Sequence, residues 1–263
     1  MPSQTPTILA LDFDGVLCNG LIEYFQTAWR TYCQIHSLEN LTPPEGLAES
    51  FYRLRPVIET GWEMPVLIQA QLQEIPEAEI LQNWGAIAET LVAKYDLDKA
   101  AVAAQLDRTR DEWIATDLSG WLSLHRFYPG VVERLKQVID SEVLPVIVTT
   151  KEGRFVRSLL AGEGIELPPD RLFGKETKKP KYQTLRELRD RYTTPEGPPT
   201  IWFIEDRLKT LQLVSQQPDL DSVGLFLADW GYNTQFSRDS VASDTRICLL
   251  SLKGFCQDFV EWL

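Results

Sequence analysis

The sequence has few histidines, few cysteines and no long apolar run. Its two histidines, His36 and His125, lie in segments typical of helix or linker, with no nucleophile and acid around them in a triad-like context. The four cysteines include no Cys-x-x-Cys pair with metal or redox spacing, which favours a reducing, cytoplasmic setting. No apolar stretch approaches the roughly 18 residues of a membrane span, and only about seven residues precede the first predicted strand, too few for a signal or transit peptide.

Positive charge is also scarce. The chain of 263 residues has 26 lysines and arginines against 38 acidic residues, a formal net charge of -12. Nucleic acids and anionic membranes attract clustered cations, so this balance argues against either as the main partner. A small anionic substrate held by a few local bases is compatible with it. The 44% hydrophobic and 24% charged content is that of a globular protein with a sizeable core.

The first distinctive feature is a short apolar run that ends in acidic residues. Residues 8–11 read as a buried strand of a parallel sheet, and Asp12, Asp14 and Gly15 follow it directly. Ligands bind at the carboxyl ends of the strands in open α/β sheets. Two carboxylates one residue apart there can divide attack and proton transfer between them, and can share a cation. An Asp-x-Asp-Gly sequence is also an ordinary turn, so the motif gains weight only from the rest of the chain.

The next hundred residues have helical periodicity without strands. Apolar residues recur at helical spacing from Leu21 to Ile35, and Pro43 and Pro44 end that run. Further helices are predicted over 46–56, 64–74, 77–94 and 98–116. We therefore expect residues 20–125 to form an inserted, all-helical domain.

From residue 126 onward, strands alternate with helices. Strands are predicted at 144–148, 171–173, 200–204, 222–227 and 246–250, each separated from the next by a helix or a loop-rich segment. Alternating apolar strands and helices indicate a doubly wound parallel sheet, in which right-handed crossovers bring the strand ends to one edge. The predicted fold is α/β, with a Rossmann-like core formed by residues 1–19 and 126–263.

Three of these strands end in residues that can carry chemistry. Asp12 and Asp14 follow the first, Thr149 follows the strand at 144–148, and Glu205 and Asp206 follow the strand at 200–204. A lysine-rich stretch, 175–181, lies between the last two. This ordered set resembles the four motifs of the haloacid dehalogenase superfamily of phosphatases, and the helical insertion matches the position of that family's cap domain. A Trp-Gly-Tyr segment at 230–232 also resembles the phosphoglycolate-phosphatase-like members.

The resemblance implies a role for each carboxylate. Asp12 would attack phosphorus as a nucleophile and form an acyl phosphate, and Asp14 would act as general acid and base. Acids gathered at one point repel one another and favour a hard cation, so Mg²⁺ is expected, with Asp12, the Asp14 carbonyl oxygen and Asp206 as ligands and Glu205 in support. The family commonly has another Asp about four residues after the acidic pair, where this chain has Thr210. That difference predicts a weaker or more water-filled metal site.

The phosphate-binding residues and the motif lysine are less sharply defined. Thr149 is assigned to the phosphate because Thr-Thr-Lys resembles the family's Thr-Asn-Lys, although threonine is also simply a good strand residue. Thr150 is a second phosphate candidate or a cap of the following helix. Lys179 precedes a proline and Lys181 stands directly before a predicted helix. Both match forms of the third motif, with a slight preference for Lys181.

Two arginines of the insertion are candidates for substrate binding. Arg53 and Arg55 lie where such a cap dips toward the core, and they can grip a carboxylate or a second phosphate. The alternative is a solvent-facing helix end in which the arginines pair with Glu59 or Glu63.

The sequence thus predicts a Mg²⁺-dependent phosphatase acting on a small phosphorylated metabolite through an aspartyl-phosphate intermediate. Asp14 argues against a haloacid dehalogenase activity and against a phosphonatase, which has Ala at that position. A phosphomutase keeps both aspartates and stays open, as does a catalytically weak or inactive phosphate-binding regulatory protein on the same fold. The sequence does not define the substrate or the oligomeric state.

Overall fold

The structure is a computed structural model, which describes residues 5–262. The chain divides into two compact units. One contains the residues up to Asn19 together with those from Arg126 onward, and the other consists of Gly20–His125. The first unit is interrupted in sequence by the second.

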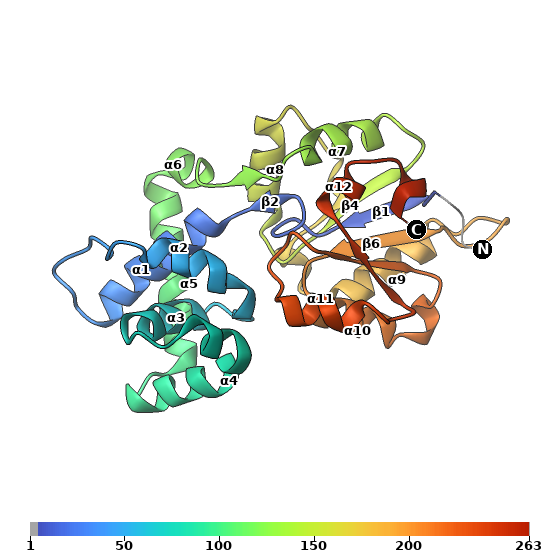
Figure 1. Cartoon of the computed structure of the whole chain (residues 1–263). Helices are drawn as coiled ribbons and strands as arrows, with labels where there is room; N and C mark the ends of the chain where they lie inside the picture. The colour runs from blue at the N-terminus through green and yellow to red at the C-terminus, as the bar shows by residue number, and fades with distance from the viewer. Residues whose placement is uncertain (1–4, 263) are drawn as a thin grey trace. The chain divides into compact units, whose positions relative to one another are not determined.

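The first unit is built on a six-stranded parallel sheet with strand order β5-β4-β1-β6-β7-β8 (Figure 1). Its strands are, in chain order, β1 (Ile8–Leu11), β4 (Leu144–Val148), β5 (Leu172–Phe173), β6 (Ile201–Glu205), β7 (Gly224–Ala228) and β8 (Ile247–Leu250). Leu11 is level with Ile147 of β4 on one side and with Ile204 of β6 on the other. The chain turns toward β4 and β5 first and toward β7 and β8 later, so β1 marks the topological switch point of the sheet.

Helices cover both faces of this sheet. The helices α7 (Val131–Ile139) and α8 (Gly153–Gly162) lie on one face, and α9 (Lys181–Arg191), α10 (Leu208–Ser215) and α11 (Gln235–Val241) on the other (Figure 1). A short helix, α12 (Leu252–Phe255), follows the last strand. This is the arrangement that right-handed crossovers produce when the chain winds in both directions from a central strand.

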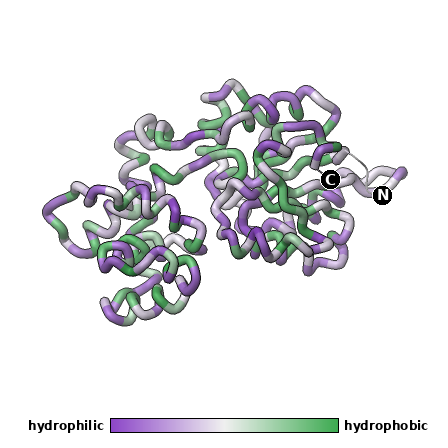
Figure 2. Tube along the Cα trace, in the orientation of Figure 1, coloured by the Kyte–Doolittle hydropathy of each residue, from purple (hydrophilic) through white to green (hydrophobic). Residues whose placement is uncertain are grey.

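The hydrophobic core lies between the strands and these helices. On the side of α9 and α10, the buried residues of the strands contact apolar side chains spaced along both helices; these include Ile8, Ala10, Val146, Val148, Leu185, Leu188, Ile201, Phe203, Leu211 and Val214. Figure 2 shows hydrophobic residues concentrated along the strands. The four residues of β1 and the five of β6 are all buried, as expected for central strands covered on both faces.

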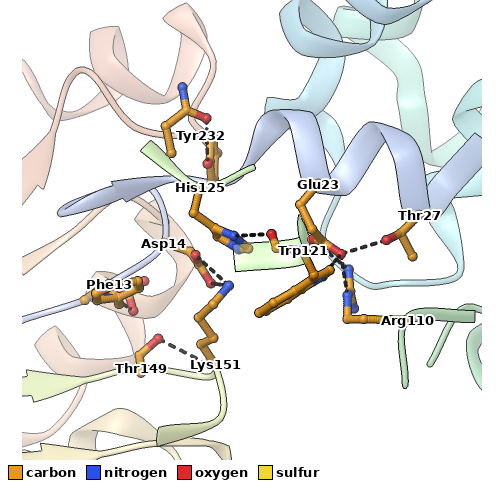
Figure 3. A network of polar contacts seen from close by, with 12 residues as sticks. Phe13, Asp14, Glu23, Thr27, Arg110, Trp121, His125, Thr149, Lys151 and Tyr232 are labelled. Atoms are coloured by element: carbon orange, nitrogen blue, oxygen red, sulfur yellow. Dashed lines mark hydrogen bonds and ion pairs between the residues drawn. The ribbon is translucent and has the colours of Figure 1, made fainter. Parts of the chain in front are cut away.

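The second unit is all-helical in its regular structure. Its helices are α1 (Leu21–Ile35), α2 (Leu47–Leu54), α3 (Glu63–Leu72), α4 (Glu77–Lys94), α5 (Lys99–Thr116) and α6 (Leu118–Leu122), with a 3-10 turn at Arg55–Val57. Glu23 of α1 is fully buried and accepts hydrogen bonds from Thr27, Arg110 of α5 and Trp121 of α6 (Figure 3). This polar cluster links three helices of the unit.

The chain leaves and re-enters the first unit through two short strands. These strands, β2 (Cys18–Asn19) and β3 (Arg126–Phe127), pair antiparallel, with Asn19 opposite Arg126. Each has only two residues, too few for a period-2 pattern, so the sequence did not predict them.

The predicted fold class, a doubly wound parallel sheet with an inserted helical domain, is confirmed. Most predicted elements are present with ends shifted by one or two residues, while the short helix α6 was not predicted. Thr150 does not cap the next helix, because the N-cap position of α8 belongs to Glu152. Within residues 5–262, no helix combines the length and the apolar character needed to cross a membrane.

Candidate active site

The site is built at the carboxyl ends of three adjacent strands. Because β4, β1 and β6 are neighbours in the sheet, the residues that follow them meet at one edge. Asp12 follows β1, Thr149 follows β4, and Glu205 and Asp206 lie at the end of β6. Asp12, Thr149, Glu205 and Asp206 are all buried. Strand order thus brings together residues that lie far apart in the sequence.

The backbone and two neighbouring groups hold Asp12 in place. Its amide donates to the Ile204 carbonyl oxygen at 3.0 Å, which continues the ladder between β1 and β6 by one residue. Its Oδ1 atom accepts from the Phe13 amide at 2.7 Å and lies 2.8 Å from the Lys181 ammonium. Both contacts fall on the same oxygen, and together they fix the orientation of the carboxylate.

Lys181 lies between two buried carboxylates. It is the first residue of α9, and its Nζ atom is 2.8 Å from Asp12 Oδ1 and 2.6 Å from Glu205 Oε2. Lys179, two residues earlier, is exposed and pairs instead with Glu187 at 2.5 Å. Of the two candidate lysines, the structure brings Lys181 to Asp12 and leaves Lys179 on the surface.

The acidic pair at the end of β6 is held by backbone amides. Glu205 Oε1 accepts from the Arg207 amide at 3.0 Å, and Asp206 Oδ2 accepts from the Tyr232 amide at 2.7 Å. Ligand oxygens of Asp12, Glu205 and Asp206 all lie within 4.8 Å of one another. The three carboxylates thus form one cluster, which we call the acidic triad.

The triad carries more negative charge than the protein neutralises. Burial and the charge of Glu205 together raise the pKa of Asp12 to about 7, although Lys181 acts in the opposite direction. Burial likewise raises the pKa of Glu205 and of Asp206, and the charge of Asp12 adds to the effect on Asp206. Burial alone would lower the pKa of Lys181, but Asp12 and Glu205 outweigh it and raise that pKa, so the lysine stays a cation. The Lys181 ammonium contacts only two of the three carboxylates, Asp12 and Glu205.

This donor set suits a divalent metal ion. Mg²⁺ prefers oxygen ligands, and a second cation would relieve the repulsion that raises the pKa values of the triad. Among the described residues, Asp12, Glu205 and Asp206 form the group of potential metal ligands that the structure brings together. Thr210 lies one turn into α10 and adds no carboxylate.

Gly15 allows the chain to pass close to Asp206. Its φ is +87°, and a Cβ atom built there would lie 2.2 Å from Asp206 Oδ2. Gly231 makes a similar approach from the other side, since its Cβ would lie 2.2 Å from the Asp206 Cβ atom. The sequence indicated a turn at Gly15, whereas the close packing of both glycines on Asp206 depends on long-range pairing.

Asp14 is half-buried and makes different contacts from the triad. Both of its carboxylate oxygens face the Lys151 ammonium, at 3.2 and 3.4 Å (Figure 3). Lys151 was noted in the sequence only as part of Thr-Thr-Lys, and its contact with Asp14 was not predicted. One signal in the sequence would have predicted this contact. Lys151 is a cation two residues after Thr149, at the same sheet edge as Asp14.

Thr149 is buried at the start of the turn that leads into α8. Its amide donates to the Phe173 carbonyl oxygen at 2.9 Å, and its hydroxyl oxygen accepts from the Lys151 amide at 3.1 Å (Figure 3). Because the oxygen serves as the acceptor in that contact, the hydroxyl hydrogen can be donated elsewhere. Thr150 is exposed.

The two arginines of the second unit have partners within that unit. Arg53 donates twice to the Glu77 carboxylate, at 3.0 and 2.6 Å, in an exposed ion pair. Arg55 donates to the Ile58 carbonyl oxygen at 3.1 Å and lies over the Tyr24 ring. Arg53 pairs with neither Glu59 nor Glu63, the two acids expected. Its exposed pair with Glu77 nevertheless favours the interpretation of a solvated helix end.

Solved structures share this fold over nearly the whole chain. No protein-family model and no curated protein matches the sequence. A haloacid dehalogenase-like family hydrolase from Streptococcus pneumoniae aligns with a TM-score of 0.57 and 14% identity, covering 95% of both chains. A structure from Clostridium acetobutylicum, described as a predicted phosphatase, aligns with a TM-score of 0.56 and 13% identity, covering 97% of this chain and 99% of that one. One from Haemophilus somnus 129pt, described as a predicted phosphoglycolate phosphatase, has a TM-score of 0.56 and 15% identity, covering 89% of each chain.

These likenesses define the class of the fold. The chain has the fold of haloacid dehalogenase-like proteins, as the motifs in its sequence predicted. At these identities the likeness concerns architecture, and the chemistry must be argued from the site.

Proposed function

We propose that this protein is a Mg²⁺-dependent phosphatase that hydrolyses a small phosphomonoester through an aspartyl-phosphate intermediate. The observation that carries the proposal is the acidic triad with the Lys181 ammonium placed between Asp12 and Glu205. Phosphoryl transfer depends mainly on positioning and on neutralising charge around the transferred group. A buried carboxylate nucleophile beside an ammonium and a cation-binding set of oxygens meets these requirements.

In the first step, an Asp12 carboxylate oxygen attacks phosphorus. The bond between phosphorus and the ester oxygen breaks, and the protonated Asp14 carboxyl gives its proton to the departing oxygen. The products are the free alcohol, an acyl phosphate on Asp12 and the Asp14 carboxylate.

In the second step, water attacks the acyl phosphate. Asp14, now a carboxylate, takes a proton from the water as its oxygen bonds to phosphorus. The Asp12–phosphorus bond breaks, which releases inorganic phosphate and restores the Asp12 carboxylate and the Asp14 acid. Atoms and charges balance over the two steps.

The other residues of the site stabilise charge. Lys181 favours the ionised, nucleophilic form of Asp12 and faces the phosphoryl group, and the Thr149 hydroxyl donates to a phosphate oxygen. Asp12, the Asp14 carbonyl oxygen and Asp206 would hold Mg²⁺, with Glu205 beside them. When bound, the metal neutralises charge on the phosphoryl oxygens.

Residues 20–125 are proposed to act as a cap that controls access to the site, as such insertions exclude water during transfer. Arg53 and Arg55 are secondary candidates for substrate contacts, since Arg53 already pairs with Glu77. The four cysteines are free, in agreement with a proposed cytoplasmic location.

The test is the release of phosphate from an aryl phosphate and from a panel of small phosphomonoesters. We expect turnover by the wild-type protein with Mg²⁺, none in the presence of a chelator, and none by Asp12→Asn. Phosphate binding without turnover by the wild-type protein in Mg²⁺ would overturn the proposal in favour of a binding protein. Transfer of phosphate to a sugar without release of free phosphate would instead indicate a phosphomutase.

A further inference from the structure

The contact between Lys151 and Asp14 has no assigned role in the chemistry described above. The Lys151 Nζ atom lies 3.2 Å from Asp14 Oδ1 and 3.4 Å from Oδ2, so one ammonium contacts both oxygens of the carboxylate. The Lys151 side chain is 8% exposed and that of Asp14 18%, which makes this pair much more enclosed than the exposed ion pairs of the protein. Because it is shielded from water, the contact is strong enough to restrain both side chains.

Lys151 is itself held firmly by its backbone. Its amide donates to the Thr149 hydroxyl oxygen at 3.1 Å, and its carbonyl oxygen accepts from the Lys175 amide at 2.9 Å. The ammonium therefore extends from a fixed point at the end of β4 to the turn after β1 (Figure 3). The lysine connects the two strand ends that carry the proposed phosphate-binding residue and the proposed acid.

A general acid must direct one oxygen at the atom that it protonates. The Asp14 side chain can rotate about two bonds, and each rotation changes the direction in which its carboxyl oxygens point. Proton transfer requires a heavy-atom separation of about 2.6–3.2 Å, so this freedom is costly for catalysis. A cation that contacts both oxygens removes this rotational freedom. After protonation, the carbonyl oxygen of the carboxyl group can still accept from the ammonium.

We propose that Lys151 is a positioning residue that fixes the Asp14 carboxyl for proton transfer to the leaving group. This inference rests on the proposed phosphatase function. The positioning role differs from a direct contact between Lys151 and the phosphoryl group. A lysine that binds the phosphoryl group would affect all substrates alike, because every substrate carries that group. In the first step, a residue that acts through Asp14 matters only for substrates whose leaving group needs a proton. The ratio kcat/KM reports this step, because the later hydrolysis of the acyl phosphate, in which Asp14 acts as a base with every substrate, does not enter it.

The dependence on the leaving group separates these two roles. Alkyl phosphates release a strongly basic oxygen that must be protonated, whereas a dinitrophenyl phosphate releases an oxygen that is stable without a proton. We expect Lys151→Met to lower kcat/KM about 10–100-fold on alkyl phosphates, the range associated with misplacing a catalytic group. On dinitrophenyl phosphate, kcat/KM should stay within about twofold of the wild-type value, since positioning of the acid contributes little to the first step there.

Three variants complete the experiment. Asp14→Asn should show the same selectivity in a stronger form, because it removes the acid itself. Lys151→Arg should recover most of the activity on alkyl phosphates, since a guanidinium can contact both carboxylate oxygens. Lys175→Met is the matched control: it removes the same charge from an exposed side chain next to Lys151, and should leave both substrates unaffected.

The outcomes separate this inference from the function on which it rests. If wild-type protein turns over and Lys151→Met lowers kcat/KM equally on both substrates, Lys151 binds phosphate and the positioning role is wrong. If Lys151→Met misfolds, as judged by its thermal unfolding, Lys151→Arg decides: a uniform loss on both substrates overturns the proposal. If the wild-type protein releases no phosphate from any substrate, the proposed function and the positioning role fall together.

Discussion

The Lys181 ammonium contacts two carboxylates of the acidic triad, those of Asp12 and Glu205. We expect Lys181→Met to lower phosphate release about 10²–10³-fold, the usual cost of removing one preorganised charge from a site. Lys179→Met should have no effect, because its ammonium pairs with Glu187 on the surface. Steady-state phosphate release on one substrate with Mg²⁺ checks both variants. A loss of activity in Lys179→Met with none in Lys181→Met would reverse the assignment.

Gly15 is a second residue at which the structure predicts the effect of a substitution. An alanine there requires a strained φ of +87° and places its Cβ 2.2 Å from Asp206 Oδ2, so Gly15→Ala should destabilise the protein by about 2 kcal/mol or more. The control is Gly162→Ala at the end of α8, where a Cβ meets no atom within 4 Å and the effect should be small. Urea unfolding of both variants measures the difference. Equal stabilities would show that the turn relaxes without cost.

At the residue scale, the sequence predicted which side chains follow the strand ends better than it predicted their contacts. The acids after β1 and β6 were identified because apolar strands lead directly into them. Lys179 and Lys181 could not be separated, since they lie two positions apart and only the start of α9 decides which ammonium reaches Asp12. The contact of Lys151 with Asp14 was missed because these residues follow two strands that are separated in sequence by the whole second unit.

At the scale of helices, the Glu23 cluster stabilises the second unit. Glu23 is fully buried, with Arg110 at 2.7 Å and the Trp121 indole at 3.1 Å. Glu23→Ala leaves the half-buried Arg110 without its carboxylate, which should cost about 3 kcal/mol. Urea unfolding followed by helix content measures this loss.

A surface ion pair serves as the comparison for the Glu23 cluster. Glu77 pairs with Arg53 at a solvent-exposed position, so we expect Glu77→Ala to leave the free energy of unfolding nearly unchanged. Equal losses in Glu23→Ala and Glu77→Ala would contradict a special role for burial.

Long periodic elements were predicted well, and short ones were not. The helix α4 has the predicted bounds, because a preceding proline and periodic apolar residues define it. The strands β2 and β3 and the five-residue helix α6 carry too few residues for a pattern. Their existence depends on tertiary contacts, such as the pairing of Asn19 with Arg126 and the burial of Trp121.

At the scale of the whole molecule, the acidic triad predicts how stability depends on pH. Folding raises the pKa of Asp12 to about 7 through burial and the charge of Glu205, and it raises the pKa values of Glu205 and Asp206 as well. In the unfolded chain these acids have pKa values of about 4. Between about pH 4 and about pH 7, the folded protein therefore binds more protons than the unfolded chain, and the free energy of unfolding falls as pH rises.

The measurement is thermal unfolding with a chelator present. Between about pH 5 and about pH 8, wild-type protein should lose about 2–3 kcal/mol more stability than Asp12→Asn, whose amide does not titrate. Adding Mg²⁺ at the higher pH should restore stability to the wild-type protein. Parallel pH curves for the two proteins would show that Asp12 keeps an ordinary pKa in the fold.

The antiparallel pair formed by β2 and β3 has a consequence for chain entropy. Asn19 and Arg126 lie opposite each other, so residues 20–125 replace the turn of what is topologically a β-hairpin. With the second unit unfolded, joining those strands closes a loop of more than a hundred residues, at an entropic cost of about 4 kcal/mol. The folded second unit already brings Gly20 and His125 together, because a Cβ on Gly20 would lie 3.7 Å from the His125 ring. Folding of the insertion thus removes most of the loop-closure cost and stabilises the sheet domain through the connection alone.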